Sequence, residues 1–190
     1  NNNKNMNNTN TKVEPRFNYT QHAWEGDKYR KNENLYGSSL TKAIRQELKE
    51  KLPNCKFSVV SKTYSGGQSV NVHLMSANFN PFNELTKEII EKIKIKCIHN
   101  WGDNWESQLN QSIENFKNTT VRDKHHQVNH YYVKDDICLT EEAKSVINQA
   151  LNIINSYNFD DSDSQIDYFH TNFYTHMSIG KWDKPFQLIN

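Results

Sequence analysis

The sequence contains little cysteine, glycine or proline: its 190 residues include three cysteines, six glycines and four prolines. The cysteines, Cys55, Cys97 and Cys138, are odd in number, lie far apart and form no C-x-x-C pair. A disulfide framework is therefore not expected, and a reducing cytoplasm is the predicted location. We expect all three thiols to be buried, since a free cysteine behaves as a small apolar residue.

Long apolar runs and an excess of one charge are also absent. No stretch approaches the roughly 20 apolar residues of a membrane-spanning helix, and the first residues do not resemble a secretion signal. The 23 basic and 22 acidic residues nearly balance. That balance argues against a strong overall attraction to nucleic acid or to anionic membranes, but it does not exclude a local patch of one charge.

Recognisable catalytic motifs are missing as well. The sequence has no G-x-S-x-G, no cysteine with a matched histidine and no paired-carboxylate pattern. We therefore predict no catalytic residues and no cofactor. The sequence favours a non-enzymatic protein, with an enzyme as the less favoured alternative.

The chain divides near residue 37. Residues 1–12 are rich in asparagine and almost free of apolar residues, so they are expected to be flexible. Residues 13–36 contain aromatic residues without periodicity and are predicted to form an extended arm that packs a few of them onto the body. Residues 38–190 are long enough for one core, and we predict a single domain there.

Apolar residues recur every three to four positions in four segments and every second position in four others. The predicted helices are residues 38–52, with Ser38 or Ser39 as the N-cap, 81–97, 103–116 and 140–154. The predicted strands are residues 55–62, 69–74, 127–133 and 166–179. Residues 118–125 are predicted to be a polar loop.

Several side chains are assigned to the core by this alternation. They include Val128 and Tyr132 in the third strand and, in the last strand, Phe169, Phe173, Met177 and Ile179. The order α-β-β-α-α-β-α-β predicts an α+β fold. We expect a two-layer sandwich in which a four-stranded, largely antiparallel sheet has helices on one face and an uncovered opposite face.

Three short motifs resemble ligand sites. The Gly66-Gly67 turn could present backbone N–H groups to an anion, but a tight hairpin also requires it, and the turn interpretation is favoured. Residues 161–172 lack the glycine and glutamate of a calcium loop. His125, His126 and His130 suggest zinc, but no cysteine or acidic partner lies at a familiar spacing, so we predict a solvated loop and no metal.

The strongest candidate surface is the uncovered sheet face. Strand alternation places on it Ser69, Asn71 and His73, then Tyr168, His170, Asn172, Tyr174 and His176, and also Gln127, Asn129 and Tyr131. Tyr64, Gly66 and Gly67 at the hairpin tip complete the predicted binding residues. Tyrosine, histidine and asparagine stack and hydrogen-bond without net charge, which suits RNA bases, a flat ligand or a protein. The alternative is a face that is merely exposed or is covered by the N-terminal arm.

A family resemblance rests on residues 38–75. Ala43-Ile44-Arg45, Leu48-Lys49, Pro53-x-x-Lys56-Phe57-Ser58-Val59 and Tyr64-Ser65-Gly66-Gly67-x-Ser69-Val70-x-Val72 resemble the large polyvalent protein-associated domain 29. The chain departs from this family's pattern after the hairpin, where residues 74–78 replace a W-T-D-G-P-like stretch, and in the insert at residues 101–126. The family is found in phages, plasmids and conjugative elements, and it supplies no catalytic residues to transfer.

The resemblance implies a mobile-element accessory protein that works in the cytoplasm of a host cell. The leading hypothesis is a protein that binds a host protein complex, with inhibition of a defence system as one role. The alternative is a domain that binds single-stranded RNA or DNA through the sheet face. Its phosphate contacts would be Lys28, Arg30, Lys31, Lys62, Arg122 and Lys124.

Overall fold

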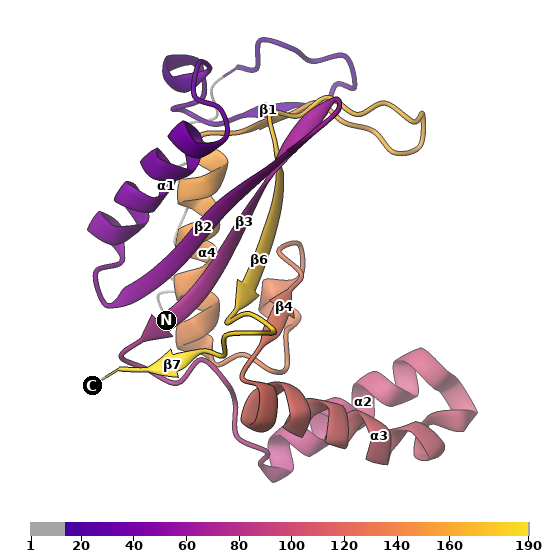
Figure 1. Cartoon of the computed structure of the whole chain (residues 1–190). Helices are drawn as coiled ribbons and strands as arrows, with labels where there is room; N and C mark the ends of the chain where they lie inside the picture. Colours follow the sequence, from indigo (N-terminus) through magenta and orange to yellow (C-terminus); the bar gives the residue numbers. More distant parts are fainter. Residues whose placement is uncertain (1–13, 190) are drawn as a thin grey trace, which may run out of the picture.

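The structure, a computed structural model, describes residues 14–189. The predicted flexible segment, residues 1–12, lies outside these residues. The elements are β1 (Trp24–Glu25), α1 (Ser38–Lys51), β2 (Cys55–Tyr64), β3 (Gly67–Ala77), α2 (Lys87–Trp101), α3 (Trp105–Lys117), β4 (His126–Val128), α4 (Glu141–Ser156), β5 (Phe159–Asp160), β6 (Tyr174–Ile179) and β7 (Gln187–Leu188) (Figure 1). The α+β class is confirmed, and the four long helices and the strands β2, β3, β4 and β6 follow the predicted order.

The main sheet has the strand order β2-β3-β6-β4, and β7 pairs with the end of β3. β2–β3 and β4–β6 are antiparallel, whereas β6 runs parallel to β3. The five-stranded sheet is therefore mixed, and it differs from the expected four-stranded, largely antiparallel sheet. The long connection from β3 to β6, which includes α2, α3 and α4, lets β6 run parallel to β3. A separate two-stranded sheet joins β1 to β5.

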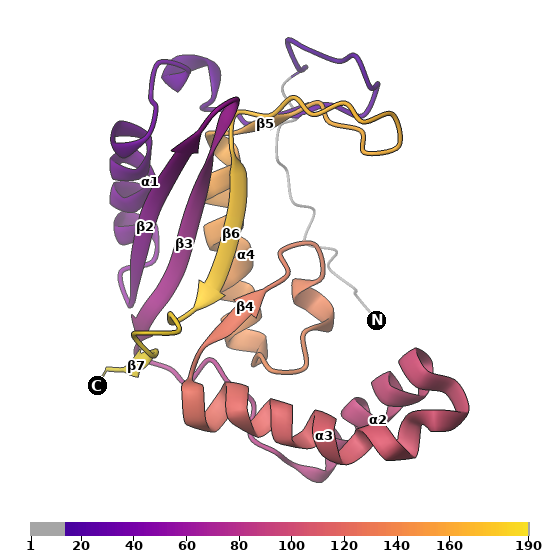
Figure 2. The same cartoon turned by 45° about the vertical axis from the view of Figure 1, so that its right-hand side comes forward.

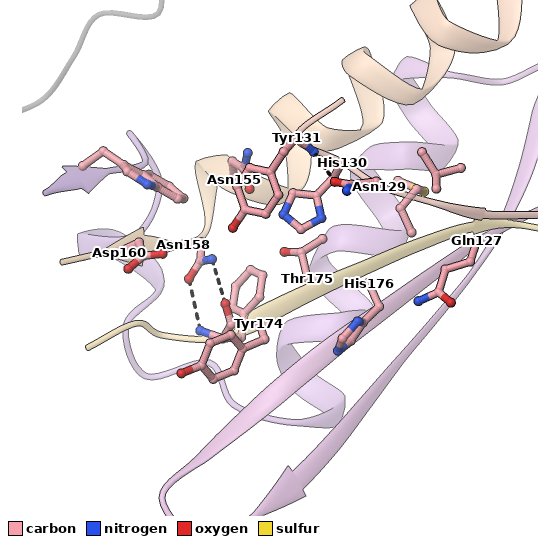
Figure 3. Close-up of a pocket in the computed structure, with 14 residues that line it drawn as sticks. Gln127, Asn129, His130, Tyr131, Asn155, Asn158, Asp160, Tyr174, Thr175 and His176 are labelled. Carbon is pink, nitrogen blue, oxygen red and sulfur yellow. Dashed lines mark hydrogen bonds between the residues drawn. The ribbon is translucent and has the colours of Figure 1, made fainter. Parts of the chain in front are cut away.

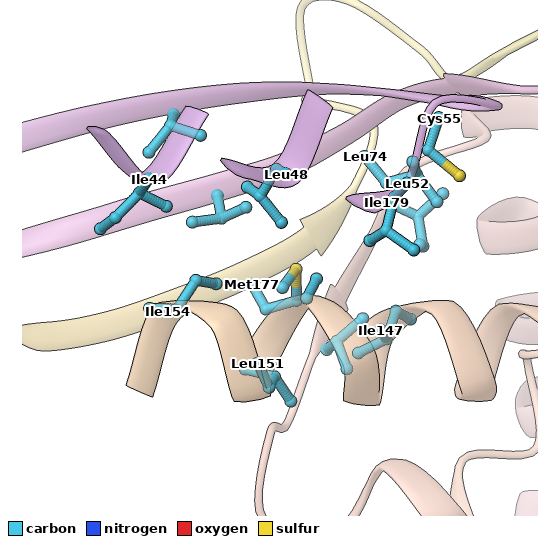
Figure 4. Packing of buried hydrophobic residues seen from close by; sticks show 14 of the residues in the cluster. Ile44, Leu48, Leu52, Cys55, Leu74, Ile147, Leu151, Ile154, Met177 and Ile179 are labelled. Carbon is cyan, nitrogen blue, oxygen red and sulfur yellow. The ribbon is translucent and has the colours of Figure 1, made fainter. Parts of the chain in front are cut away.

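The core lies between the sheet and the two helices α1 and α4, which cover one face (Figure 2). Leucine and isoleucine recur every four residues in α1, so Leu40, Ile44 and Leu48 form one buried stripe. These side chains meet those of α4 and the strands, including Ile147, Ile154, Leu74 and Met177 (Figure 4). We refer to this unit as the sheet body.

Helices α2 and α3 form the predicted helical hairpin, which projects from one end of the sheet body (Figure 1). Its apolar residues make a second buried cluster of Ile89, Ile93, Cys97 and Phe116. The prediction that α2 begins near Pro81 is wrong. Thr86 is the N-cap, accepting a hydrogen bond from the Ile89 N–H. Within residues 14–189 no helix has the length and apolar character needed to cross a membrane.

The predicted start of the last strand is wrong, and so is the predicted burial of Phe169. The last strand begins at Tyr174 and not at residue 166, and Phe169 is 56% exposed in a loop, whereas Phe173, Met177 and Ile179 are buried as expected. The loop follows Asp161, whose carboxylate accepts hydrogen bonds from the N–H groups of Tyr19 and Thr20. Alternation along the sequence cannot reveal this long-range anchor.

The strand predicted at residues 127–133 ends at Val128. Asn129 turns the chain, since its backbone carbonyl accepts from Tyr132 N–H and its side chain accepts from Tyr131 N–H. Tyr132 is consequently 64% exposed, and Val133 is buried in its place. The predicted polar loop after α3 is instead a wide helical turn, Asn118–Asp123. The N-cap of α1 is Gly37, so the prediction of Ser38 or Ser39 is also wrong.

Candidate functional site

The sheet face opposite α1 and α4 carries a set of outward polar side chains, which we call the open face. Its residues alternate with buried core residues and are matched by strand register: Lys62, Tyr64, Ser69, Asn71, His73, Gln127, Tyr174, His176 and Ser178. The strands β2, β3, β4 and β6 contain no aspartate or glutamate. The open face therefore offers hydrogen-bonding and aromatic groups without negative charge from its own strands.

One end of the open face is formed by tyrosines. Tyr36, Tyr64 and Tyr174 are 54%, 48% and 42% exposed. The pKa of the Tyr64 phenol lies above its ordinary value, first because of burial and then because Tyr174 and Tyr36 are near. A side chain at Gly67 would place its Cβ 3.2 Å from the Tyr64 ring, so this glycine lets the ring lie across the turn. Gly66 has a φ of +88° at the hairpin tip, which fits the turn interpretation of the Gly-Gly pair.

The other end of the open face is a histidine hollow of about 210 Å³, lined by Asn71, His73, His125, Gln127, His176, Met177 and Ser178. The Ser178 hydroxyl donates to the Gly180 carbonyl at 2.7 Å and lies 2.7 Å from His73 Nδ1. Since that hydroxyl has one proton, His73 Nδ1 must be the donor to it. Burial, with the charge of Lys181 and His125, lowers the pKa of His73 to about 4. At neutral pH, His73 Nε2 is therefore an unprotonated acceptor.

This arrangement does not make Ser178 a nucleophile. A general base must accept the hydroxyl proton, but here the proton points to Gly180 and the imidazole donates. Ser178 is also 5% exposed. The pair holds the His73 ring in place at the wall of the histidine hollow.

A groove of about 740 Å³ borders the open face along β6 (Figure 3). Trp24, His130, Tyr131, Asn155, Asn158, Asp160, Tyr174, Thr175 and His176 are among the residues that line it. The His130 and Tyr131 rings are in contact, with centroids 4.1 Å apart and planes tilted by 39°. Burial, followed by nearby His176, lowers the pKa of His130. The groove is thus mostly uncharged, with aromatic walls and amide groups.

The groove follows an edge of β6 that is only partly paired. Gly180 N–H, directly after β6, donates to Leu74 on β3. Backbone groups alternate between the two edges of a strand, so the odd-numbered residues of β6 point away from β3. On that outer edge β4 pairs with Met177 and Ile179. Phe173 exchanges two hydrogen bonds with the Asn158 amide, at 3.1 and 2.9 Å (Figure 3).

Thr175 lies between these two paired positions. Within residues 14–189, neither a strand nor a side chain hydrogen-bonds to its outward N–H and C=O groups. Asn158 therefore takes the place of a neighbouring strand at Phe173. At Thr175, the next outward-pointing residue, the backbone N–H and C=O groups face the groove, and we call this unpaired position the open slot. A peptide unit or an amide side chain fits this donor and acceptor pair.

The structure brings together only part of the predicted site. Tyr64, Asn71, His73, Tyr174 and His176 share the open face as predicted. Gly66 and Gly67 lie at its hairpin end, and Tyr131 lies on the groove wall.

The other three predicted residues do not share that face. Tyr168 and His170 lie in the loop before β6 and pack against the N-terminal arm, with Tyr19 and Phe17 ring centroids 4.8 and 5.0 Å away. Asn172 donates to the Tyr157 carbonyl. The prediction that these residues continue the face is wrong because the strand has not yet begun.

The sequence patterns do not single out Tyr36, Trp24 or Thr175 as site residues. The first two belong to segments without periodicity, and Thr175 matters only through the strand edge that the fold leaves open. The three histidines considered for zinc also separate. His125 lines the histidine hollow, His130 contacts the Tyr131 ring, and His126 contacts Asp136.

The family model of the large polyvalent protein associated domain 29 matches residues 36–139, more than half of the chain. The chain belongs to this family. No curated protein and no solved structure matches it. The matched region runs from just before α1 to the segment before α4, so it contains the β2–β3 side of the open face but not β6.

Proposed function

We propose that this member of the large polyvalent protein associated domain 29 family is a non-enzymatic binding module of a phage or other mobile element. Its partner is an extended segment of a host protein, which binds along the outer edge of β6. The observation that carries the proposal is the open slot at Thr175, which lies in a groove of about 740 Å³. A host defence complex is the target class that the family resemblance suggests.

The groove supports this proposal in three ways. The Thr175 backbone offers one donor and one acceptor with the spacing of a strand edge, so main-chain hydrogen bonds supply affinity for any extended segment. Trp24 and Tyr131 supply exposed aromatic walls, at 39% and 77% exposure, and such residues often dominate binding energy. His130 and His176 provide further hydrogen-bonding groups without a fixed charge.

A displayed library of random peptides, selected on the intact chain, tests the proposal. Peptides that bind the wild type should bind Trp24→Ala and Tyr131→Ala at least tenfold more weakly, since aromatic anchors are worth about 2 kcal/mol each. Trp182→Ala is the matched control, because Trp182 is 86% exposed and does not line the groove. Its affinity should stay within about twofold of the wild type, on the scale of a neutral surface contact.

A second measurement locates the peptide. On binding, the Thr175 amide should gain protection from hydrogen exchange. The backbone amides of Tyr174 and His176 already point toward β3, so their exchange rates should change little. If no peptide is enriched, or if the groove variants bind as well as Trp182→Ala does, the proposed function is wrong.

Single-stranded nucleic acid on the open face is the second candidate function. The favouring observation is that the charges of Lys181 and, more weakly, Lys62 act on His73 and are opposed only in part by Asp183, while β2, β3, β4 and β6 contribute no carboxylate. Tyr36 and Tyr64 could stack bases at the other end. Binding of labelled single-stranded RNA or DNA should weaken with salt, and Tyr64→Ala should reduce it at least fivefold, given about 1–3 kcal/mol per stacked base. Salt-independent or absent binding excludes this candidate.

A further inference from the structure

Three side chains with metal-binding atoms meet where the helical hairpin joins the sheet body. His126 begins β4, and Asp136 and Cys138 lie in the segment that leads to α4. One ligand atom from each lies within 4.8 Å of the other two, and all three residues are half-buried. The group is separate from the open face, since the backbone alternation of β4 turns His126 and Gln127 to opposite sides.

Hydrogen bonds already orient two of these side chains. His126 Nε2 lies 2.6 Å from Asp136 Oδ2. The other carboxylate oxygen, Oδ1, accepts the Cys138 N–H at 3.0 Å. The side chains of His126 and Asp136 are 19% and 13% exposed. The carboxylate is therefore fixed between the imidazole and the backbone of the cysteine, so the thiol is held beside the pair.

The donor set is one nitrogen, one oxygen and one sulfur, a combination that suits zinc. Tetrahedral zinc with ordinary bond lengths separates such donors by about 3.3–3.6 Å. An ion between them requires the His126–Asp136 contact of 2.6 Å to open by about 0.7 Å and keeps the sulfur, which lies within 4.8 Å of both other ligand atoms, close to the pair. Side-chain rotation allows both adjustments.

We propose that His126, Asp136 and Cys138 form a three-ligand site for a zinc-class divalent cation, with one coordination position left open. The site ties β4 to the segment on which the helical hairpin rests, because Ile137 and Cys138 pack against the apolar cluster of α2 and α3. The bound ion fixes the hairpin against the sheet body. The metal site shares no residue with the peptide groove.

Cobalt titration of the reduced, intact chain tests the site directly. One equivalent of Co²⁺ should produce a saturable thiolate-to-cobalt absorption band, and Zn²⁺ should abolish the band by displacement. Cys138→Ser should remove the band, and His126→Ala and Asp136→Asn should weaken cobalt binding about 10-fold or more. Zn²⁺ should raise the thermal midpoint of the wild type but not that of Cys138→Ser.

Two matched variants serve as controls. Cys97→Ser removes a different buried thiol near the same hairpin, and His125→Ala removes the neighbouring histidine, which lines the histidine hollow. Both should retain the cobalt band. The wild-type titration requires no variant to fold, so absence of a saturable band refutes the site by itself. Loss of the band in Cys97→Ser with retention in Cys138→Ser would assign the thiolate elsewhere and also overturn the proposal.

Discussion

The sheet body and the helical hairpin bury apolar residues on different scales. The sheet body joins residues from α1, α4 and four strands in one continuous cluster, in which Ile44, Leu48 and Leu74 are fully buried. The helical hairpin buries only Ile89, Ile93, Cys97 and Phe116, and several of its larger residues, such as Ile95 and Trp101, are exposed. Regions with few buried contacts open at lower free energy, so we expect the hairpin to open while the sheet body remains folded.

The largest expected effect comes from the sheet body. Phe173 is 1% exposed, and Phe173→Ala should lower the free energy of unfolding by about 3–5 kcal/mol because it leaves a cavity in the core. Phe169, four residues earlier, is 56% exposed, so Phe169→Ala should cost less than about 1 kcal/mol. Urea denaturation of both variants measures the difference. Equal losses would show that the loop before β6 is part of the core.

These two phenylalanines also show how far the sequence predicts the fold. Alternation along the sequence assigns both side chains to the core. However, the alternating pattern includes Phe169, whereas the strand itself begins only at Tyr174. The periodicity of α1, α4 and the β2–β3 hairpin reflects local burial, and their positions were predicted correctly. The loop before β6 depends on Asp161 reaching back to Thr20, a contact between residues far apart in the sequence.

The candidate site also has a part that the sequence predicts and a part that depends on tertiary structure. The β3 part of the open face, Asn71 and His73, follows from alternation within a well-predicted strand. The groove, by contrast, depends on where β4 ends and on the Asn158 amide that pairs with Phe173. The proposed metal site combines His126 with residues 10 and 12 positions further along the chain, and such a spacing matches no familiar motif. Sequence periodicity carries no information on these tertiary arrangements.

The next largest effect concerns the helical hairpin. Phe116 is 5% exposed and belongs to the small cluster, so Phe116→Ala should remove about 2–4 kcal/mol of local stability, near the low end for such truncations. Amide hydrogen exchange should show faster exchange throughout α2 and α3, with β3 and β6 unchanged. If β3 and β6 lose protection equally, the helical hairpin and the sheet body unfold together, and the hairpin does not open separately.

A pH-dependent effect is expected in the sheet body. The pKa of His73 is lowered to about 4 in the folded protein, against about 6.5 in an unfolded chain. The unfolded state therefore binds more protons between these values, so this contribution to stability is present above pH 6.5 and is lost as the pH falls toward 4. The loss should amount to about 2 kcal/mol, allowing for partial exposure of the ring.

His73→Gln isolates that contribution. Glutamine retains a hydrogen-bonding group near Ser178 but does not titrate, so the free energy of unfolding of this variant should fall less steeply than that of the wild type between pH 6.5 and 4. Parallel pH profiles for the two proteins would assign the loss to other groups.

The smallest expected effects come from two matched helix caps, one in each region. Thr86 caps α2 by accepting from Ile89 N–H at 3.3 Å, and Thr140 caps α4 by accepting from Ala143 N–H at 3.2 Å. Each Thr→Ala change should cost about 1 kcal/mol, since the substitution is chemically the same.

The two costs should nevertheless appear in different measurements. Thr140→Ala should shift the global urea midpoint, because α4 packs on the main core. Thr86→Ala should leave that midpoint nearly unchanged and should speed amide exchange in α2 and α3 alone. If both variants shift the global midpoint equally, the helical hairpin belongs to the same cooperative unit as the sheet body.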